Sequence, residues 1–311
     1  MPIEQASVRA VPKPWGVSDL RPWSSIDGTG NAVGELWFER PDADTPPSAL
    51  LLKLLFTSAP LSIQVHPDDT FARAMGMPNG KSEAWYIISA TPDAQIGVGL
   101  KDRVTPQQLR TSISTGAIAD LLQWRPAVPG DVVFIPAGTI HAIGAGIVLA
   151  EIQQRSDTTF RLFDYGSERE LHIDDGVAVA HAWPLRPQGD PTRLTDERTV
   201  LVANRHFVLE RVELPEKSSW ALLAEPETWI LVLDGHAAIG LAPLSIGQAI
   251  FAGGGRSSIE VGANGLTALI AYPATTPAGS LLQKLGGHST QPGQTAVPDG
   301  PALTGLAEAL T

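Results

Sequence analysis

The sequence predicts a mainly β protein built from two strand-rich blocks, and three observations support this fold class. The chain has 311 residues, more than twice the commonest domain size, so two domains are expected. Its 30 Gly and 26 Pro are spread without a fixed period, which is typical of short strands joined by turns. Short apolar runs occur on both sides of a polar, proline-containing stretch at 184–195, which we interpret as the linker.

In the first block, strands are expected with one helical interruption. The expected strands are 34–38 (GELWF), 61–65 (LSIQV), 84–89 (AWYIIS), 132–136 (VVFIP), 147–154 (IVLAEIQQ) and 158–165 (TTFRLFDY). A helix is expected over 105–124, because its apolar residues recur at helical spacing after the pair Thr105-Pro106, which suits a cap and a first turn. This block, with its helical insertion, is predicted to occupy residues 1–190.

In the second block, the sequence again alternates between strand-like runs and turns. The expected strands are 206–214 (HFVLERVEL), 229–233 (WILVL), 238–242 (AIGLA), 249–253 (AIFAG) and 267–273 (TALIAYP). The block is predicted to span 196–274. Residues 275–311, rich in Gly, Pro, Thr and Gln before a short apolar pattern, are interpreted as a loosely attached tail.

The two blocks contain an internal echo. Glu83-x-Trp85 parallels Glu227-x-Trp229, and the turn-rich segment from Gly130 to His141 parallels 247–258. Duplication of one barrel unit is the economical interpretation. Because a serine stands at position 258, where the first block has His141, the second block is predicted to lack a metal site.

Composition excludes several classes of partner and site. The net charge of −11 argues against a nucleic-acid or anionic-membrane surface, which requires a basic patch. The chain has no cysteine, so any metal must be bound by imidazole, carboxylate or amide groups. No apolar stretch suits export or membrane insertion, and a cytoplasmic location is expected. The sequence gives no indication of oligomeric state.

Four side chains are candidates for binding one divalent ion. In LSIQVH, Ser62, Gln64 and His66 share one strand face, so Gln64 and His66 can reach the same ion. A polar row is also typical of a solvated sheet face, but Glu83 at the start of the next strand and His141 after a tight turn add further donors. Ligand type leaves zinc, manganese, cobalt, nickel and iron open. The remaining histidines are expected to be ordinary structural or surface residues: His172, His181, His206, His236 and His288.

The segment G-D-x-x-F-I-P-A-G-T-x-H, from Gly130 to His141, resembles the second motif of the cupin superfamily of jelly-roll barrels. More narrowly, LLKLLFTSAPLSIQVHPDD, KSEAWYII, GDVVFIPAGTIHAIGAG and LAEIQQRSDTTFRLFDYG resemble the signature segments of type I phosphomannose isomerase. The resemblance covers 51–166 and, more weakly, the PWG and GELWF segments. It implies two cupin-type barrels and a zinc enzyme, with one Zn²⁺ per chain, that interconverts mannose 6-phosphate and fructose 6-phosphate. The implied ligands are Gln64, His66, Glu83 and His141, and the implied active-site residues are Ser62, Lys81 and Arg161.

The chemistry of such an isomerase suits these residue types. Moving a carbonyl between C1 and C2 creates a negatively charged enediolate, which a divalent ion, Arg161 and Lys81 can stabilise. Glu151, on a strand with apolar neighbours, is a candidate for the proton shuttle, because burial raises a carboxyl pKa. A metal-bound water, Lys81 or His66 are alternatives for this role. The chain departs from longer relatives by lacking a large helical insertion and by having Ser82 where many have proline.

Other functions remain open on the residues alone. A non-catalytic sugar-binding or regulatory cupin would keep the metal as a structural staple, although it would not need Lys81 and Arg161 at the open coordination position. An isomerase of an unphosphorylated sugar and a cupin dioxygenase with redox-active iron or copper are further alternatives. The expected partner is a small-molecule sugar phosphate, with neither nucleic acid nor membrane.

Overall fold

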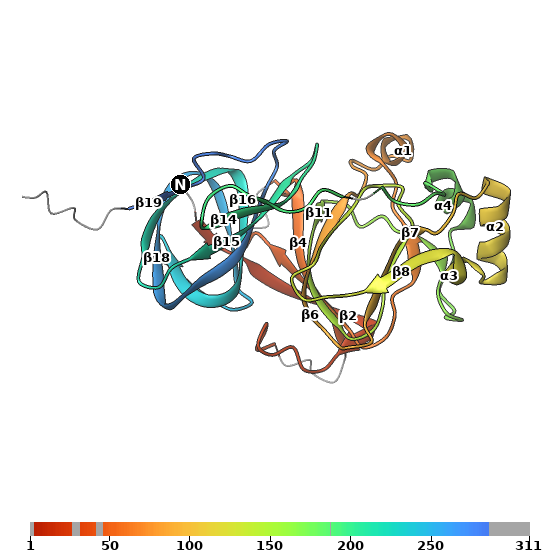
Figure 1. Cartoon of the computed structure of the whole chain (residues 1–311), viewed down its shortest axis with the longest axis horizontal. Coiled ribbons are helices and arrows are strands. Elements are labelled where there is room, and N and C mark those ends of the chain that lie inside the picture. The colour runs from red at the N-terminus through yellow and green to blue at the C-terminus, as the bar shows by residue number, and fades with distance from the viewer. Residues whose placement is uncertain (1–2, 27–31, 42–45, 187, 286–311) are drawn as a thin grey trace, which may run out of the picture.

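The computed structural model describes residues 3–26, 32–41, 46–186 and 188–285. Strands dominate these ranges and form three antiparallel sheets (Figure 1), so the prediction of a mainly β fold is confirmed. None of the helices in these ranges has the length and apolar character needed to cross a membrane.

The first two sheets are built from residues 7–163. The six-stranded sheet has the order β2 (Ser7–Val17), β3 (Val33–Glu39), β4 (Leu50–Thr57), β11 (Ile147–Gln154), β6 (Glu83–Ala90) and β9 (Val132–Ile135). The five-stranded sheet has the order β12 (Phe160–Phe163), β5 (Ile63–Val65), β10 (His141–Ile143), β7 (Gln95–Leu100) and β8 (Leu122–Pro126). Several neighbouring strands, such as β4 and β11 or β5 and β10, come from distant parts of the sequence, which brings the candidate site residues together.

The third sheet, called here the C-terminal sheet, has eight strands. Its main path is β13 (Thr192–Arg193), β14 (Arg198–Ala203), β15 (Val208–Leu214), β18 (Ala249–Tyr272), β16 (Ser219–Ile239) and β17 (Ala242–Ser245), with β1 (Ile3–Gln5) on β18 and β19 (Leu282–Lys284) on β16. Trp229 of β16 pairs with both Phe251 and Ala271 of β18, because these long strands curl and meet twice. The run expected at 229–233 is therefore part of one longer strand. The division into two barrels stays a prediction.

Four short helices accompany the sheets in the described ranges: α1 (Asp69–Ala74), α2 (Pro106–Thr115), α3 (Ile118–Leu121) and α4 (Ile173–Val179). Thr105 caps α2 through a capping box with Gln108, as the sequence predicts. The single helix expected over 105–124 is wrong in its second half. Gly116, with φ = 78°, ends α2, and the chain enters β8 at Leu122.

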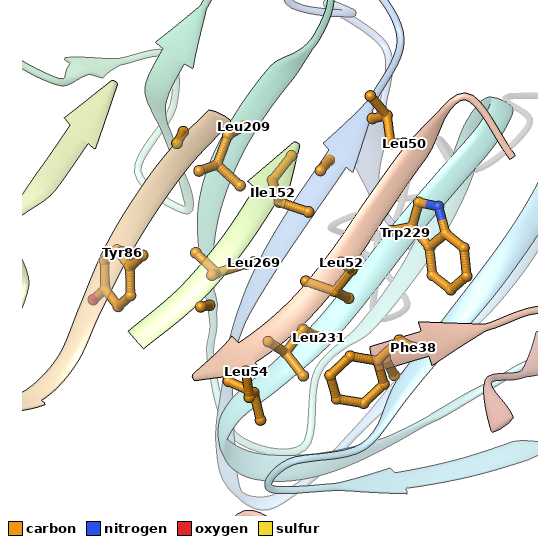
Figure 2. Close-up of a cluster of buried hydrophobic side chains, with 14 of the residues drawn as sticks. Phe38, Leu50, Leu52, Leu54, Tyr86, Ile152, Leu209, Trp229, Leu231 and Leu269 are labelled. Atoms are coloured by element: carbon orange, nitrogen blue, oxygen red, sulfur yellow. The ribbon is translucent and has the colours of Figure 1, made fainter. Parts of the chain in front are cut away.

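The central strands of the six-stranded sheet are buried on both faces. In β4, Leu50, Leu52 and Leu54 pack against the C-terminal sheet, whereas Lys53 and Leu55 face the five-stranded sheet. A strand covered on both faces has few polar positions, which explains the nearly continuous apolar run. Figure 2 shows the contact between sheets: labelled side chains of β3, β4, β6 and β11 meet those of the C-terminal sheet. They are Phe38, Leu50, Leu52, Leu54, Tyr86, Ile152, Leu209, Trp229, Leu231 and Leu269.

The segment that follows the C-terminal sheet is attached at its beginning. β19 pairs with β16 from Trp220 to Leu222, and Arg198 donates a hydrogen bond to the carbonyl oxygen of Ala278. The prediction of a loose tail is therefore wrong for 275–285. The rest of the predicted tail, 286–311, lies outside the described residues.

The internal echo is preserved in its turns and altered in its strands. Gly130 and Gly247 both have positive φ, 91° and 78°, as do Gly138 and Gly255. In contrast, an irregularity between Pro226 and Thr228 leaves Glu227 outside the pairing, with φ = 69°. Glu83 pairs regularly with Ile135. Trp85 packs between the six- and five-stranded sheets, whereas Trp229 packs between the six-stranded and C-terminal sheets.

Candidate functional site

Two imidazoles and a carboxylate meet between the six- and five-stranded sheets. His66 follows β5, His141 begins β10 and Glu83 begins β6, and all three are buried. His66 Nε2 lies 3.4 Å from Glu83 Oε2, and His141 Nε2 lies 3.4 Å from Glu83 Oε1. Candidate ligand atoms of the three residues all lie within 4.8 Å of one another, so they could hold one metal ion.

Both histidines are oriented by the chain around them. His66 Nδ1 donates to the carbonyl oxygen of Thr158, and His141 Nδ1 donates to that of Thr139, each at 2.9 Å. Protonation at Nδ1 leaves the Nε2 lone pair directed at Glu83 in the neutral ring. Burial lowers the pKa of both histidines, with a further contribution from Lys81, and brings that of His66 to about 3. Both rings are therefore neutral at neutral pH.

Glu83 is held ionised in the same buried place. Burial opposes its ionisation, but the opposing effects, of which the positive charge of Lys81 is the largest, outweigh burial and keep its pKa well below the usual value. Lys81 Nζ lies 3.1 Å from Glu83 Oε2, and Trp85 Nε1 donates to Glu83 Oε1 at 3.1 Å. Burial alone would lower the pKa of Lys81, yet Glu83 and Glu151 raise it, so Lys81 remains a cation.

Gln64 lies at the edge of this group. Its Nε2 is 3.3 Å from His141 Nε2, and its Oε1 accepts a hydrogen bond from Ser62 at 3.3 Å. A half-turn of the amide exchanges its oxygen and nitrogen, which are alternatives of nearly equal shape. In that orientation Gln64 presents an oxygen to the same centre as the three buried residues.

The residues fit a divalent metal ion. His66 Nε2 is buried without a hydrogen-bond partner, and Glu83 Oε2 has only its ion pair with Lys81; the unpaired nitrogen is costly unless another group satisfies it. Neutral imidazole nitrogens and an ionised carboxylate are the donors that zinc and related divalent metals require. Their nearest carbonyl partners also supply the outer hydrogen bonds typical of metal-bound histidine.

A cavity of about 210 Å³ opens beside this group and contains the predicted catalytic side chains. Ser62, Gln64, Lys81, Glu151 and Arg161 all line it. Its charged lining comprises five cations and three carboxylates: Lys13, Lys53, Lys81, Arg161 and Arg169, with Glu35, Glu151 and Asp157. A chain with a net charge of −11 thus presents an excess of positive charge in this cavity.

Glu151 sits on β11 as the sequence predicts, with its carboxylate fixed on both sides. Its Oε1 lies 3.3 Å from Lys53 Nζ, and its Oε2 accepts a hydrogen bond from Trp85 Nε1 at 3.2 Å. Burial, followed by the negative charge of Glu83, raises its pKa, which confirms the direction expected from its apolar neighbours. Trp85 therefore bridges Glu83 and Glu151.

Arg161 lies in the cavity wall opposite the six-stranded sheet. Its Nη1 donates to the carbonyl oxygen of Glu170 at 2.7 Å, while its Nε is buried without a hydrogen-bond partner. Its backbone N–H donates to Nδ1 of His172 at 3.2 Å, so this histidine supports the strand that carries Arg161. Of the other histidines expected to be ordinary, His181 stacks on Trp183, and His288 lies outside the described residues.

Several charged residues that line the cavity were not predicted from the sequence. Lys53 interrupts the apolar run of β4, Glu35 interrupts that of β3, and Lys13 lies in β2. A charge in the middle of a buried strand is itself a signal, because such a group requires a partner. Arg169 and Asp157 lie outside the described strands and helices, and no comparable pattern marks them.

Sequence comparisons identify related proteins over part of the chain. No protein-family model matches. A mannose-6-phosphate isomerase of Bacillus subtilis is 40% identical over 163 residues, or 48% of this chain and 51% of that protein. One from Streptococcus mutans is 35% identical over 212 residues, or 62% and 63%. The chain thus spans about half the length of the first relative and less than two thirds of the second.

Comparison of structures extends the similarity. The crystal structure of the mannose 6-phosphate isomerase from Bacillus subtilis matches with a TM-score of 0.77 and 25% identity, covering 88% of this chain and all of that one. A zinc-bound mannose 6-phosphate isomerase matches with a TM-score of 0.67 and 15% identity, covering 87% and 99%, which shows similarity of fold. The chain is therefore a homologue of the mannose-6-phosphate isomerases and shares their fold.

Proposed function

We propose that the protein is a metal-dependent aldose–ketose isomerase that interconverts mannose 6-phosphate and fructose 6-phosphate. One observation carries the proposal: the buried His66–Glu83–His141 group adjoins a cavity in which Lys81, Glu151 and Arg161 converge. The named activity of the relatives supports the choice of reaction. The excess of cationic side chains supports a phosphorylated substrate.

We propose Gln64, His66, Glu83 and His141 as the ligands of one Zn²⁺. A zinc ion bound there would supply Lewis-acid chemistry to the oxygens of the open-chain sugar. One structural neighbour is a zinc-bound isomerase, and the donors here suit that ion. The His66 and His141 rings are already oriented by carbonyl partners, so little reorganisation accompanies binding.

In this proposal the chain's own residues move the proton and balance the charge. Glu151 takes the proton from C2 of the open-chain aldose and returns it to C1, while a proton moves between O2 and O1. Its raised pKa suits this exchange, since the carboxyl must both accept and release a proton. Lys81 and Arg161 stabilise negative charge on the enediolate or the phosphate, and Ser62 positions Gln64 by accepting a hydrogen bond from its amide nitrogen once the amide is turned as described.

The test is turnover of defined sugars by the purified, zinc-loaded protein. Conversion of fructose 6-phosphate to mannose 6-phosphate, followed by NMR, is the expected result. Glu151→Gln should reduce turnover about 100-fold or more while leaving bound zinc unchanged. Turnover of free mannose or fructose without turnover of their 6-phosphates would contradict the phosphate part. Absence of any sugar isomerisation by the zinc-loaded protein would contradict the proposal that the protein is an isomerase.

A further inference from the structure

A chain of buried charges adjoins Glu151, and the reaction proposed above does not use it. Lys53 Nζ lies 3.3 Å from Glu151 Oε1 and 3.9 Å from Glu35 Oε2. Glu35 Oε1 lies 3.1 Å from Lys13 Nζ. The Lys53 side chain is 4% exposed, whereas that of Lys13 is 30% exposed, so the chain of charges runs from the interior toward solvent.

The sheet places Lys53 next to Glu151 by strand register. Lys53 of β4 pairs with Trp37 of β3 on one side and with Glu151 of β11 on the other, and Glu151 pairs with Trp85 of β6. Side chains paired in this way are neighbours on one face. Lys53 Nζ also lies over the Trp37 ring at 4.4 Å. One row across four strands thus fixes the amine against the carboxylate.

Glu35 completes the support of Lys53. It accepts a hydrogen bond from Trp37 Nε1 at 2.5 Å, and its pKa is lowered because Lys53 and Lys13 outweigh the opposing effect of burial. An apolar residue at position 53 would continue the run of leucines in β4. It would also avoid burying a charge, since the desolvation of a buried ion pair often exceeds the attraction between its partners. The position of Lys53 therefore indicates a role in the cavity and not in the packing of β4.

We propose that Lys53, supported by Glu35, is a positioning residue that holds the Glu151 carboxylate toward the substrate cavity. The contact at Glu151 Oε1, together with the hydrogen bond from Trp85 to Oε2, leaves the carboxylate little freedom to turn. A base held in one orientation transfers a proton more effectively than one that must first find it. The inference rests on the proposed isomerase function for its kinetic consequence and on geometry for its structural one.

The experiment compares Lys53→Met, Lys53→Arg and the double variant Lys53→Met/Glu35→Gln. Lys53→Met should lower kcat about 10- to 100-fold, with KM changed less than about threefold and zinc content unchanged. Lys53→Arg, which keeps a buried cation, should recover most of kcat. The double variant removes both charges, so it should be more stable than Lys53→Met while kcat stays low.

A matched control comes from a buried ion pair far from the cavity. Arg198 pairs with Glu210 in the C-terminal sheet, and neither lines the cavity. Arg198→Met should lose stability as Lys53→Met does, yet retain the kcat of the wild type per folded molecule. A wild-type kcat in the folded, zinc-loaded double variant would overturn the proposal.

A structural measurement decides the proposal separately from activity. Crystal structures of the wild type and the double variant should show the Glu151 carboxylate turned away from its original position only in the variant. An unmoved carboxylate would overturn the positioning role even if turnover fell. A wild type without isomerase activity would refute the proposed reaction, whereas the carboxylate position would still support or refute the role of Lys53.

Discussion

Glu83 and Glu210 are both fully buried glutamates on strands, yet their surroundings differ in one decisive respect. Glu210 accepts hydrogen bonds from Arg198 Nε and Nη2, at 2.8 Å each, and from the Tyr272 hydroxyl at 2.6 Å. Glu83 pairs with Lys81 through Oε2 but also faces two neutral histidines, and the Nε2 atom of His66 beside it has no hydrogen-bond partner. Equal burial thus accompanies a closed structural pair in one sheet and an incomplete set of donors in another. Incompleteness, more than burial, marks the functional site.

The tryptophans that follow the two echoed glutamates reinforce the contrast. Trp85 packs between the six- and five-stranded sheets and donates to Glu83 and Glu151. Trp229 packs in the cluster between the six-stranded and C-terminal sheets (Figure 2). Glu227, displaced by the bulge, accepts hydrogen bonds from the backbone N–H groups of Ala49 and Leu50. The same short motif therefore serves the candidate site in one copy and a sheet contact in the other.

The largest expected effect comes from removing the charge of Glu83 from the candidate metal site. Glu83→Gln should abolish zinc binding, measured by mass spectrometry, and lower turnover of fructose 6-phosphate at least about 1000-fold, or about 4 kcal/mol of transition-state stabilisation. The matched variant Glu210→Gln should keep both properties in the folded protein. Retention of stoichiometric zinc by Glu83→Gln would refute the ligand assignment.

A loss of stability is expected from breaking the buried ion pair between Arg198 and Glu210. Arg198→Met leaves the Glu210 carboxylate buried with Tyr272 as its remaining side-chain partner, and should lower the free energy of unfolding by about 3–5 kcal/mol. The double variant Arg198→Met/Glu210→Gln should recover much of this loss, because no buried charge is left unpaired. Urea denaturation monitored by tryptophan fluorescence measures both. Equal stability of single and double variants would show that the pair is not closed as described.

A smaller loss of stability is expected at Glu227, the residue of the second block that corresponds to Glu83. Glu227→Ala removes two backbone hydrogen bonds of 2.7 and 2.6 Å and should cost about 1–3 kcal/mol of unfolding free energy. Glu227→Gly removes the same bonds but suits φ = 69°, so it should be about 1 kcal/mol more stable than the alanine variant. Thermal unfolding of the two variants under identical conditions provides the comparison. An alanine variant as stable as the glycine variant would exclude backbone strain at this position.

The last comparison concerns the change in unfolding free energy per pH unit. In metal-free protein, the pKa of His66 is about 3 in the folded state, against 6.5 ordinarily, because burial disfavours the charged ring. Between these values the unfolded chain binds the extra proton, so stability should fall on acidification from pH 6.5 by up to about 1.4 kcal/mol per pH unit for this group. Urea denaturation at pH 6.5, 5.5 and 4.5 measures the slope. His66→Gln should reduce it, and an unchanged slope would contradict this assignment.

Local pattern predicted much of the fold and of the candidate site. The alternation in LSIQVH predicted that Gln64 and His66 share one face, because strand parity is a local property, and the motif from Gly130 to His141 added His141, which the structure pairs with Gln64. The end of α2 was missed, since helical spacing of Ile118, Leu121 and Leu122 persists beyond the turn at Gly116.

Long-range pairing accounts for what the sequence could not predict. The row that joins Trp37, Lys53, Glu151 and Trp85 depends on the register of four strands separated widely along the chain. The bulge at Glu227 could not be predicted either, since the pattern Glu-x-Trp is identical in both copies and only the pairing partners differ.

The placement of β1 has a consequence for how the chain folds. Ile3–Gln5 pairs with 250–252 of β18, while β2, starting at Ser7, belongs to the six-stranded sheet. Residues 3–5 must therefore wait for partners about 250 positions later in the sequence. Together with the shared apolar cluster, this crossing links the sheets into one cooperative unit, so denaturation should proceed as a single transition, and a cut between the two halves would leave each with an unpaired strand edge.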